Sequence, residues 1–258
     1  MVSVHPTAVV DAAAQLGSNV RVGPYAVIEA DVSVGDGCEI GSHVRLASGT
    51  RLGERVRVAH GAVLGTEPQD LKFSGEKTYL EVGSDTVIRE YATLNRGTRY
   101  GGKTVVGHHC VIMAYTHIAH DCMIGNHVIL ANAVNMAGHV VIEDYAGVGG
   151  LTPIHQFVRI GQHSFVGGGY RVARDVPPFV LAMGEPLRYG GLNRVGLERR
   201  GFPRETLLVL KKAYRILFRE APTKQEALQR IENELPPLPE LRAVVTFVRA
   251  SQRGLIKG

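Results

Sequence analysis

Residues 105–172 read VVGHHCVIMAYTHIAHDCMIGNHVILANAVNMAGHVVIEDYAGVGGLTPIHQFVRIGQHSFVGGGYRV, with an aliphatic residue at every sixth position, as at Ile112 and Ile118. The same register extends back to Val4, and 26 of the 29 positions from Val4 to Val172 are Val, Ile, Leu or Met. The next residue is Gly or Ala in 18 of those 26 cases, which suits a tight corner of the backbone.

A period of six matches neither a helix nor a long strand. Three short strands separated by corners make one triangular coil of about 18 residues, and successive coils stack about 4.8 Å apart. We therefore predict an all-β solenoid, a parallel β-helix of hexapeptide repeats, in residues 1–190. Two loop excursions are expected, at about 66–80 and 96–104, where Asp70, Glu76 and Tyr100 replace the aliphatic residue.

The sequence changes character after DVPPF, residues 175–179. Apolar residues at helical spacing predict three helices, at 203–220, 223–235 and 238–253, and hence a C-terminal three-helix domain in residues 191–258. Residues 199–258 hold 13 Lys or Arg against 6 Asp or Glu, whereas the preceding 198 residues are slightly acidic. This basic tail is a candidate dock for an acidic partner.

The composition excludes several classes of protein. The chain of 258 residues is 45% hydrophobic and 21% charged, and no window is apolar enough for a membrane span or a signal peptide, so we expect a cytoplasmic protein. Cys38, Cys110 and Cys122 fall on inward positions of the repeat, which predicts buried free thiols. We do not expect nucleic-acid binding, because the basic surplus is confined to the tail.

Histidines supply the candidate chemistry. His117 and His120 flank a repeat aliphatic residue in HIAHDC, and Asp121 follows directly. His139 and His155 lie 19 and 35 residues beyond His120, roughly one and two coils further on. We expect these side chains to point outward, with His120, His139 and His155 stacked along one edge. An imidazole with a pKa near 6.5 is suited to remove a proton from a sugar hydroxyl.

Several motifs resemble one known family. HIAHDC (117–122), AGHV (137–140), the glycine run 167–169, DVPPF and GLNRVGLERRGF (191–202) are similar to the UDP-N-acetylglucosamine O-acyltransferases of lipid A biosynthesis, over nearly the whole chain. The resemblance implies a homotrimer of left-handed β-helices with active sites between subunits. It also implies transfer of a (3R)-3-hydroxyacyl group from acyl carrier protein to the 3-position of UDP-N-acetylglucosamine, without cofactor or metal.

The resemblance assigns roles to individual residues. His120 is expected to be the general base, Asp121 its orienting carboxylate, and Gly138, one coil further on, the donor of an oxyanion-binding N–H. Gly168 is expected to set the acyl length and, as a glycine, to admit a long chain. The expected substrate-binding residues are Asp70, Lys72, Asn95, His117, His139, His155, Gln156, Asn193, Arg199 and Arg200. Because a single solenoid offers no concave pocket, we expect the site to need a second chain.

Three alternatives stay open. Asn95 and Val195 stand where the family commonly has histidine and glutamate, so the acceptor could be a 3-amino sugar nucleotide that yields an amide. Some hexapeptide trimers are zinc carbonic anhydrases, and His117, His120 and His139 could ligate zinc. A non-catalytic binding scaffold is the third reading, although it leaves the outward histidines unexplained.

Overall fold

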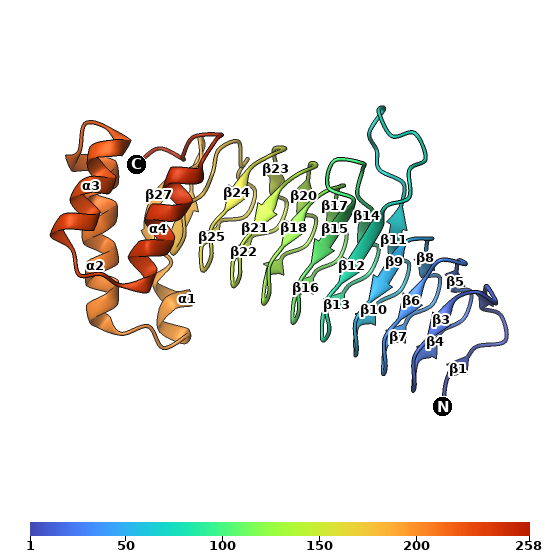
Figure 1. The fold of residues 1–258 in the computed structure, drawn as a ribbon. Coiled ribbons are helices and arrows are strands. Elements are labelled where there is room, and N and C mark those ends of the chain that lie inside the picture. The colour runs from blue at the N-terminus through green and yellow to red at the C-terminus, as the bar shows by residue number, and fades with distance from the viewer.

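The computed structural model describes residues 1–258 and contains three sheets that the chain visits in turn (Figure 1). Except at the last pair of the first sheet, each strand pairs in parallel with the strand one coil on. The first sheet (sheet A) has 11 strands and the other two (sheets B and C) have 8 each. Paired residues in most coils are 18 apart, as in Asn135 opposite His117. This is the parallel arrangement that the period of six predicts.

The strands are mostly two residues long. Sheet A holds β1 (Ser3–Val4), β4 (Arg21–Val22), β7 (Glu39–Ile40), β10 (Arg57–Val58), β13 (Val87–Ile88), β16 (Val111–Ile112), β19 (Ile129–Leu130), β22 (Gly147–Val148), β25 (Phe165–Val166), β26 (Val180–Met183) and β27 (Arg188–Leu192). Sheet B holds β2 (Val9–Val10), β5 (Val27–Ile28), β8 (Arg45–Leu46), β11 (Val63–Thr66), β14 (Thr93–Asn95), β17 (His117–Ile118), β20 (Asn135–Met136) and β23 (Pro153–Ile154). Sheet C holds β3 (Gln15–Leu16), β6 (Ser33–Val34), β9 (Thr50–Leu52), β12 (Tyr79–Val82), β15 (Lys103–Val106), β18 (Met123–Ile124), β21 (Val141–Ile142) and β24 (Arg159–Ile160).

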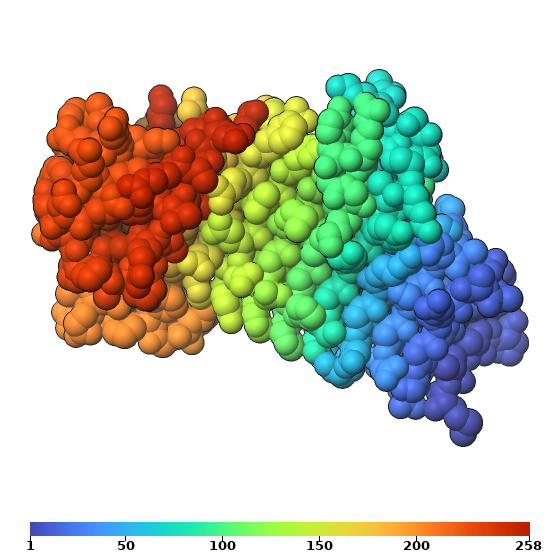
Figure 2. Space-filling model, in the orientation of Figure 1, coloured from blue at the N-terminus to red at the C-terminus, as the bar shows by residue number.

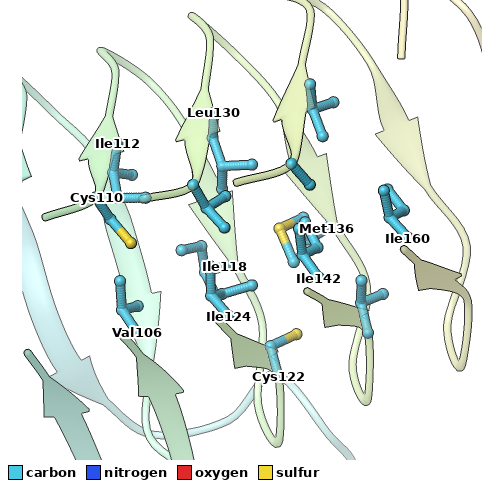
Figure 3. Packing of buried hydrophobic residues seen from close by; sticks show 14 of the residues in the cluster. Val106, Cys110, Ile112, Ile118, Cys122, Ile124, Leu130, Met136, Ile142 and Ile160 are labelled. Atoms are coloured by element: carbon cyan, nitrogen blue, oxygen red, sulfur yellow. The ribbon is translucent and has the colours of Figure 1, made fainter. Parts of the chain in front are cut away.

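The repeat aliphatic residues fill the inside of the coils. Figure 3 shows Ile118, Ile124, Leu130 and Met136 pointing toward one another between the sheets, and the exposure of each is at most 3%. All three cysteines are fully buried and free, which confirms the predicted buried thiols. Each buried aliphatic side chain contributes about 1.5–3 kcal/mol, so the stacked interior is the main source of stability.

The corners differ from the sequence expectation in one respect. The residue in the left-handed backbone region is the third after the aliphatic residue, as in Asp121 (φ 59°) and His139 (φ 60°), not the glycine directly after it. The glycines serve stacking instead. A Cβ added at Gly107 would lie 2.5 Å from the carbonyl oxygen of Gly125 in the next coil.

Two loops interrupt the repeat on the same side of the molecule (Figures 1 and 2). The first loop, residues 67–78, joins β11 to β12, and the second loop, residues 96–102, joins β14 to β15. They are held together, because Arg99 donates its backbone N–H to Glu76 Oε1 at 3.0 Å. Hydrogen bonds donated by backbone N–H groups, of which that of Ser74 has the largest effect, lower the pKa of Glu76 to about 2.

The C-terminal part is helical and packs at one end of the coils (Figure 1). It contains α1 (Arg194–Arg199), α2 (Arg204–Arg215), a π-helical turn (Ile216–Glu220), α3 (Lys224–Glu234) and α4 (Pro239–Ala250). The prediction of three helices missed α1, whose six residues include a single buried one, Leu197. No helix has the length and apolar character required to cross a membrane.

Strand β27 connects the two parts of the chain. It pairs antiparallel with β26 at the end of sheet A, and the residues on either side of position 190 both belong to it. The expected boundary after residue 190 therefore falls within a strand that extends the first sheet. Tyr214 of α2 also links the helices to the coils, since its buried hydroxyl donates to the carbonyl of Pro178, just before β26.

Candidate active site

A hollow of about 630 Å³ lies over the outer face of sheet B. Its floor is a row of residues on successive strands, Thr93, His117, Asn135 and Pro153, which are paired in register. Gln69 of the first loop contributes to the rim. The expectation that a single chain has no concave site holds only in part, because the hollow is a shallow, open one over a sheet face, with Gln69 at its rim.

His120 and Asp121 lie where the chain turns from sheet B to sheet C. The His120 Nδ1 is 2.8 Å from Asp121 Oδ2, and the two side chains are 14% and 2% exposed. Asp121 adopts the left-handed conformation that aspartate tolerates better than most residues. The expected outward orientation of His120 holds only in part, since its ring lines the hollow but is largely covered.

The Asp121 carboxylate is held ionised. Burial alone would raise its pKa, but hydrogen bonds from Thr98 and from His120 outweigh burial, and the pKa is lowered. An ionised carboxylate can only accept, so Nδ1 of His120 must carry the proton in this pair. The neutral imidazole then leaves Nε2 unprotonated, which is the state required of a general base.

Gly138 lies directly against the His120 ring. A Cβ at this position would be 2.5 Å from Cε1 and 2.7 Å from Nε2 of His120, so any side chain would displace the imidazole. The Gly138 carbonyl accepts from the Phe157 N–H at 3.3 Å, whereas the Gly138 N–H has no acceptor within the chain. A free N–H beside the base fits the predicted role in binding an oxyanion.

The three histidines occupy one corner but not one column. Because 19 and 35 are not multiples of 18, each histidine is displaced along the corner relative to the others. His139 stacks on Phe157 at 4.7 Å between ring centroids and meets the His120 ring edge-on at 5.1 Å. His155 lines the hollow beside Gln156. Burial lowers the pKa of both His139 and His117, so both rings favour the neutral form.

The first-loop residues lie at different depths. Asp70 accepts from the Lys72 N–H at 3.0 Å. Burial lowers the pKa of His139, and the charges of Asp121 and, to a smaller extent, Asp70 oppose this lowering without reversing it. The Lys72 side chain is exposed. Asn95 is only 3% exposed, and its amide group donates to Thr66 Oγ1 and to the Glu67 carbonyl, each at 2.9 Å. Asn95 therefore fastens the base of the loop, and its Oδ1 is left without a partner.

Asn193, Arg199 and Arg200 are not brought to the hollow of the same chain. Asn193 caps α1 by accepting from Gly196 and donates to the carbonyl of His163 at 2.9 Å. Arg200 lies over the Tyr145 ring at 5.2 Å, at the corner between sheets C and A. His120 lies at the corner between sheets B and C, so Arg200 and His120 lie on different edges of the triangular solenoid.

Gly168 follows β25 at the third corner, between sheets A and B. A Cβ there would lie 3.0 Å from the Gly150 carbonyl oxygen, which is tighter than ordinary packing. Close stacking of the coils is thus one sufficient reason for glycine. Its role in setting acyl length stays a prediction.

The sequence reasoning missed several residues that line the hollow, among them Gln69, Asn135 and Arg171. The repeat contained the signal for two of them. Asn135 and Arg171 directly precede aliphatic residues of sheet B or its continuation at Val172, as His117 precedes Ile118, and such residues must face outward. Gln69 lies in an aperiodic loop, where no register predicts its direction.

The residues do not favour a zinc site. His120, Asp121 and His139 cluster within 4.8 Å, whereas His117 is hydrogen-bonded through Nδ1 to Thr93 Oγ1 at 2.7 Å. The Asp121 oxygens already accept from Thr98, Gly101 and His120. A metal ion would have to displace donors that hold the second loop in place.

Comparisons with known proteins identify similar chains. The family model described as "Udp N-acetylglucosamine O-acyltransferase; Domain 2" matches residues 175–256, and one for bacterial transferase hexapeptide repeats matches 13–48, 31–66 and 103–138. An acyl-[acyl-carrier-protein]–UDP-N-acetylglucosamine O-acyltransferase of Thiobacillus denitrificans is 45% identical over 100% of both chains. Its counterpart from a Sulfurihydrogenibium species is 53% identical, over 99% of this chain and 94% of the relative.

Solved structures give the same result. The crystal structure of LpxA, a UDP-N-acetylglucosamine acyltransferase from Bacteroides fragilis, superposes with a TM-score of 0.97 at 39% identity, over 98% of this chain and 100% of that one. LpxA from Acinetobacter baumannii superposes with a TM-score of 0.96, also at 39% identity, over 98% and 99% of the two chains.

Proposed function

The chain belongs to the UDP-N-acetylglucosamine O-acyltransferase family, and we propose on this basis that it transfers a (3R)-3-hydroxyacyl group from acyl carrier protein to the 3-hydroxyl of UDP-N-acetylglucosamine. The reaction is the first step of lipid A biosynthesis. The observation that carries the proposal is the pair formed by His120 and ionised Asp121, set against the free N–H of Gly138 at the edge of the hollow.

The chemistry follows from these three groups. The Nε2 of His120 takes the proton of the sugar hydroxyl as that oxygen attacks the thioester carbonyl, and Asp121 stabilises the imidazolium that forms. The Gly138 N–H donates to the oxyanion of the tetrahedral intermediate. Collapse of the intermediate breaks the C–S bond, and His120 returns its proton to the departing thiolate of the carrier protein.

The remaining substrate-binding residues point to an assembly. Asn193, Arg199 and Arg200 lie on a different edge from His120, so they reach the same substrate only if a neighbouring chain supplies them. A homotrimer of left-handed solenoids, with sites between subunits, satisfies this requirement. In this arrangement Arg199 and Arg200 of one chain bind phosphates of a sugar nucleotide held at His120 of the next.

The helical part supports docking of the carrier protein. A hollow of about 700 Å³ between β27, α1 and α2 is lined by Arg204 and Lys211, and by Arg194, which is paired with Glu198 at 2.6 Å. Leu208, which is 58% exposed, also lines it. Acyl carrier proteins are acidic, so a basic surface with an apolar centre complements them. Its place at the end of the coils leaves the acyl arm free to reach along the solenoid.

The test is a direct assay of donor and acceptor. Purified protein is incubated with carrier protein charged with 3-hydroxyacyl chains of several lengths, together with UDP-N-acetylglucosamine or its 3-amino analogue. We expect an ester of UDP-N-acetylglucosamine, identified by product mass and by its cleavage with hydroxylamine. If an amide forms with the 3-amino analogue and no ester forms, the acceptor is the 3-amino sugar nucleotide instead of UDP-N-acetylglucosamine. The absence of transfer from every donor would overturn the proposal.

A further inference from the structure

We propose that Thr98 is a positioning residue of this reaction, which acts by fixing the carboxylate of Asp121 against the general base. Nothing in the sequence motifs assigns a role to Thr98, which lies in the second loop, 23 residues from Asp121. The inference rests on the proposed function for its catalytic consequence. The fixing of the Asp121 carboxylate by the second loop does not depend on that function.

Thr98 holds both oxygens of the carboxylate. Its backbone N–H donates to Asp121 Oδ1 at 3.0 Å, and its hydroxyl donates to Asp121 Oδ2 at 2.6 Å. The second oxygen is the one that accepts from His120 Nδ1 at 2.8 Å. Counted over whole residues, Thr98 is 2% exposed and Asp121 6%, so water does not compete for these positions. The carboxylate therefore cannot rotate about its last bond without losing two donors.

The direction of the hydroxyl proton is also fixed. The Thr98 Oγ1 accepts from the Tyr100 N–H at 3.3 Å, which occupies a lone pair and leaves the proton to point at Asp121. Gly101 donates a further N–H to Asp121 Oδ1 at 3.1 Å, and a Cβ on Gly101 would lie 2.6 Å from that oxygen. The second loop is thus folded around the carboxylate.

This arrangement matters for the base because orientation sets the tautomer. When Oδ2 faces Nδ1, the imidazole proton stays on Nδ1 and the lone pair on Nε2 faces the substrate. Without the Thr98 hydroxyl, the carboxylate keeps the N–H donors of Thr98 and Gly101 on Oδ1, but His120 is the only donor left on Oδ2. Oδ2 is then held less firmly against Nδ1, and the imidazole can place its proton on either nitrogen. The loss lowers the fraction of enzyme with a competent base, without removing any group that contacts substrate.

The test compares Thr98→Val, which removes the hydroxyl at nearly constant volume, with Thr98→Ser, which keeps it. We expect kcat to fall at least about tenfold in Thr98→Val, as for a lost hydrogen bond to a charged group, and to stay within about threefold of wild type in Thr98→Ser. KM for both substrates should stay within about twofold. In an Asp121→Asn background, Thr98→Val should add little further loss, because both changes act through one carboxylate.

A second readout is independent of turnover. ¹⁵N–¹H correlation spectra of the His120 ring should show the Nδ1-protonated tautomer in wild type and Thr98→Ser, and a mixture in Thr98→Val. If Thr98→Val fails to fold, the pair Thr98→Ala and Thr98→Ser gives the same comparison. An unchanged kcat and tautomer in a folded variant lacking the hydroxyl would overturn the inference. Inactive wild-type enzyme with the expected tautomer shift would instead count against the proposed function alone.

Discussion

At the scale of single residues, the reactive groups occupy corner positions that the repeat leaves free. The aliphatic residues and the small residues four places later point inward, whereas the second and third residues after each aliphatic residue lie on the corner. His120 and Asp121 are the second and third residues after Ile118. Gly138 is the second after Met136, and its lack of a side chain makes room for the imidazole.

Gly138→Ala tests this fit. The backbone of Gly138 lies outside the positive-φ region, so alanine is compatible with the fold, but its Cβ would lie 2.5 Å from the His120 ring. The imidazole must move, and we expect kcat to fall at least about 100-fold, as for loss of a general base, with little change in KM. Steady-state kinetics beside a melting curve measure both effects. Normal turnover in a folded variant would contradict this, because it would mean that the His120 imidazole remains functional beside an alanine.

At the scale of elements, stacked rings run along the corner between sheets C and A. Between ring centroids, His163 lies 4.7 Å from Tyr145 and 5.6 Å from Phe179, on both of which it stacks. It meets the Phe202 ring edge-on, with 5.0 Å between centroids. Burial, assisted by the charge of Arg200, lowers the pKa of His163 to about 4. This column joins the coils to α1, which precedes Phe202.

The low pKa makes the column sensitive to acid. An unfolded histidine binds a proton below a pH of about 6.5, whereas folded His163 does so only near 4, so the free energy of unfolding decreases as pH falls through that window. We expect His163→Phe, which keeps an aromatic ring in the stack, to lose less Tm between pH 7 and pH 4.5 than wild type. Parallel melting curves for the two proteins would argue against a neutral buried His163.

The elements also show what the sequence could predict. The period of six determined the sheets, the buried aliphatic residues and the three cysteines, because burial at every sixth position has one structural solution. Thr223 was expected to begin a helix, and its hydroxyl does accept from the Glu226 N–H. The period carries no information about the aperiodic loops. The position of Gln69 at the hollow and the contact of Thr98 with Asp121 therefore could not be predicted from the sequence.

At the scale of the whole molecule, the expected site residues are divided between edges, and the proposed trimer predicts complementation. His120→Ala should be inactive and Arg200→Ala impaired, but mixed subunits should regain activity. Random assembly from equal amounts, after unfolding and refolding together, places an intact His120 beside an intact Arg200 in about a quarter of the interfaces. Activity of the mixture no greater than that of the two variants assayed separately would contradict a shared site.

The basic helical part predicts a dependence on salt that differs between donors. The Debye length falls from about 10 Å at 0.1 M to about 3 Å at 1 M, so salt weakens attraction between Arg204 or Lys211 and an acidic carrier protein. KM for the acylated carrier protein should rise steeply over this range, whereas KM for a neutral pantetheine thioester should change little. Equal responses of the two donors would remove the docking role.

The central claim is that the His120 imidazole, oriented by Asp121, is the base of an acyl transfer. The most direct measurement is kcat/KM of His120→Ala with acylated carrier protein and UDP-N-acetylglucosamine, in protein whose melting curve and oligomeric state match wild type. The account predicts a loss of at least about 100-fold, the smallest effect expected for a missing general base. A folded variant that keeps near wild-type kcat/KM would contradict it.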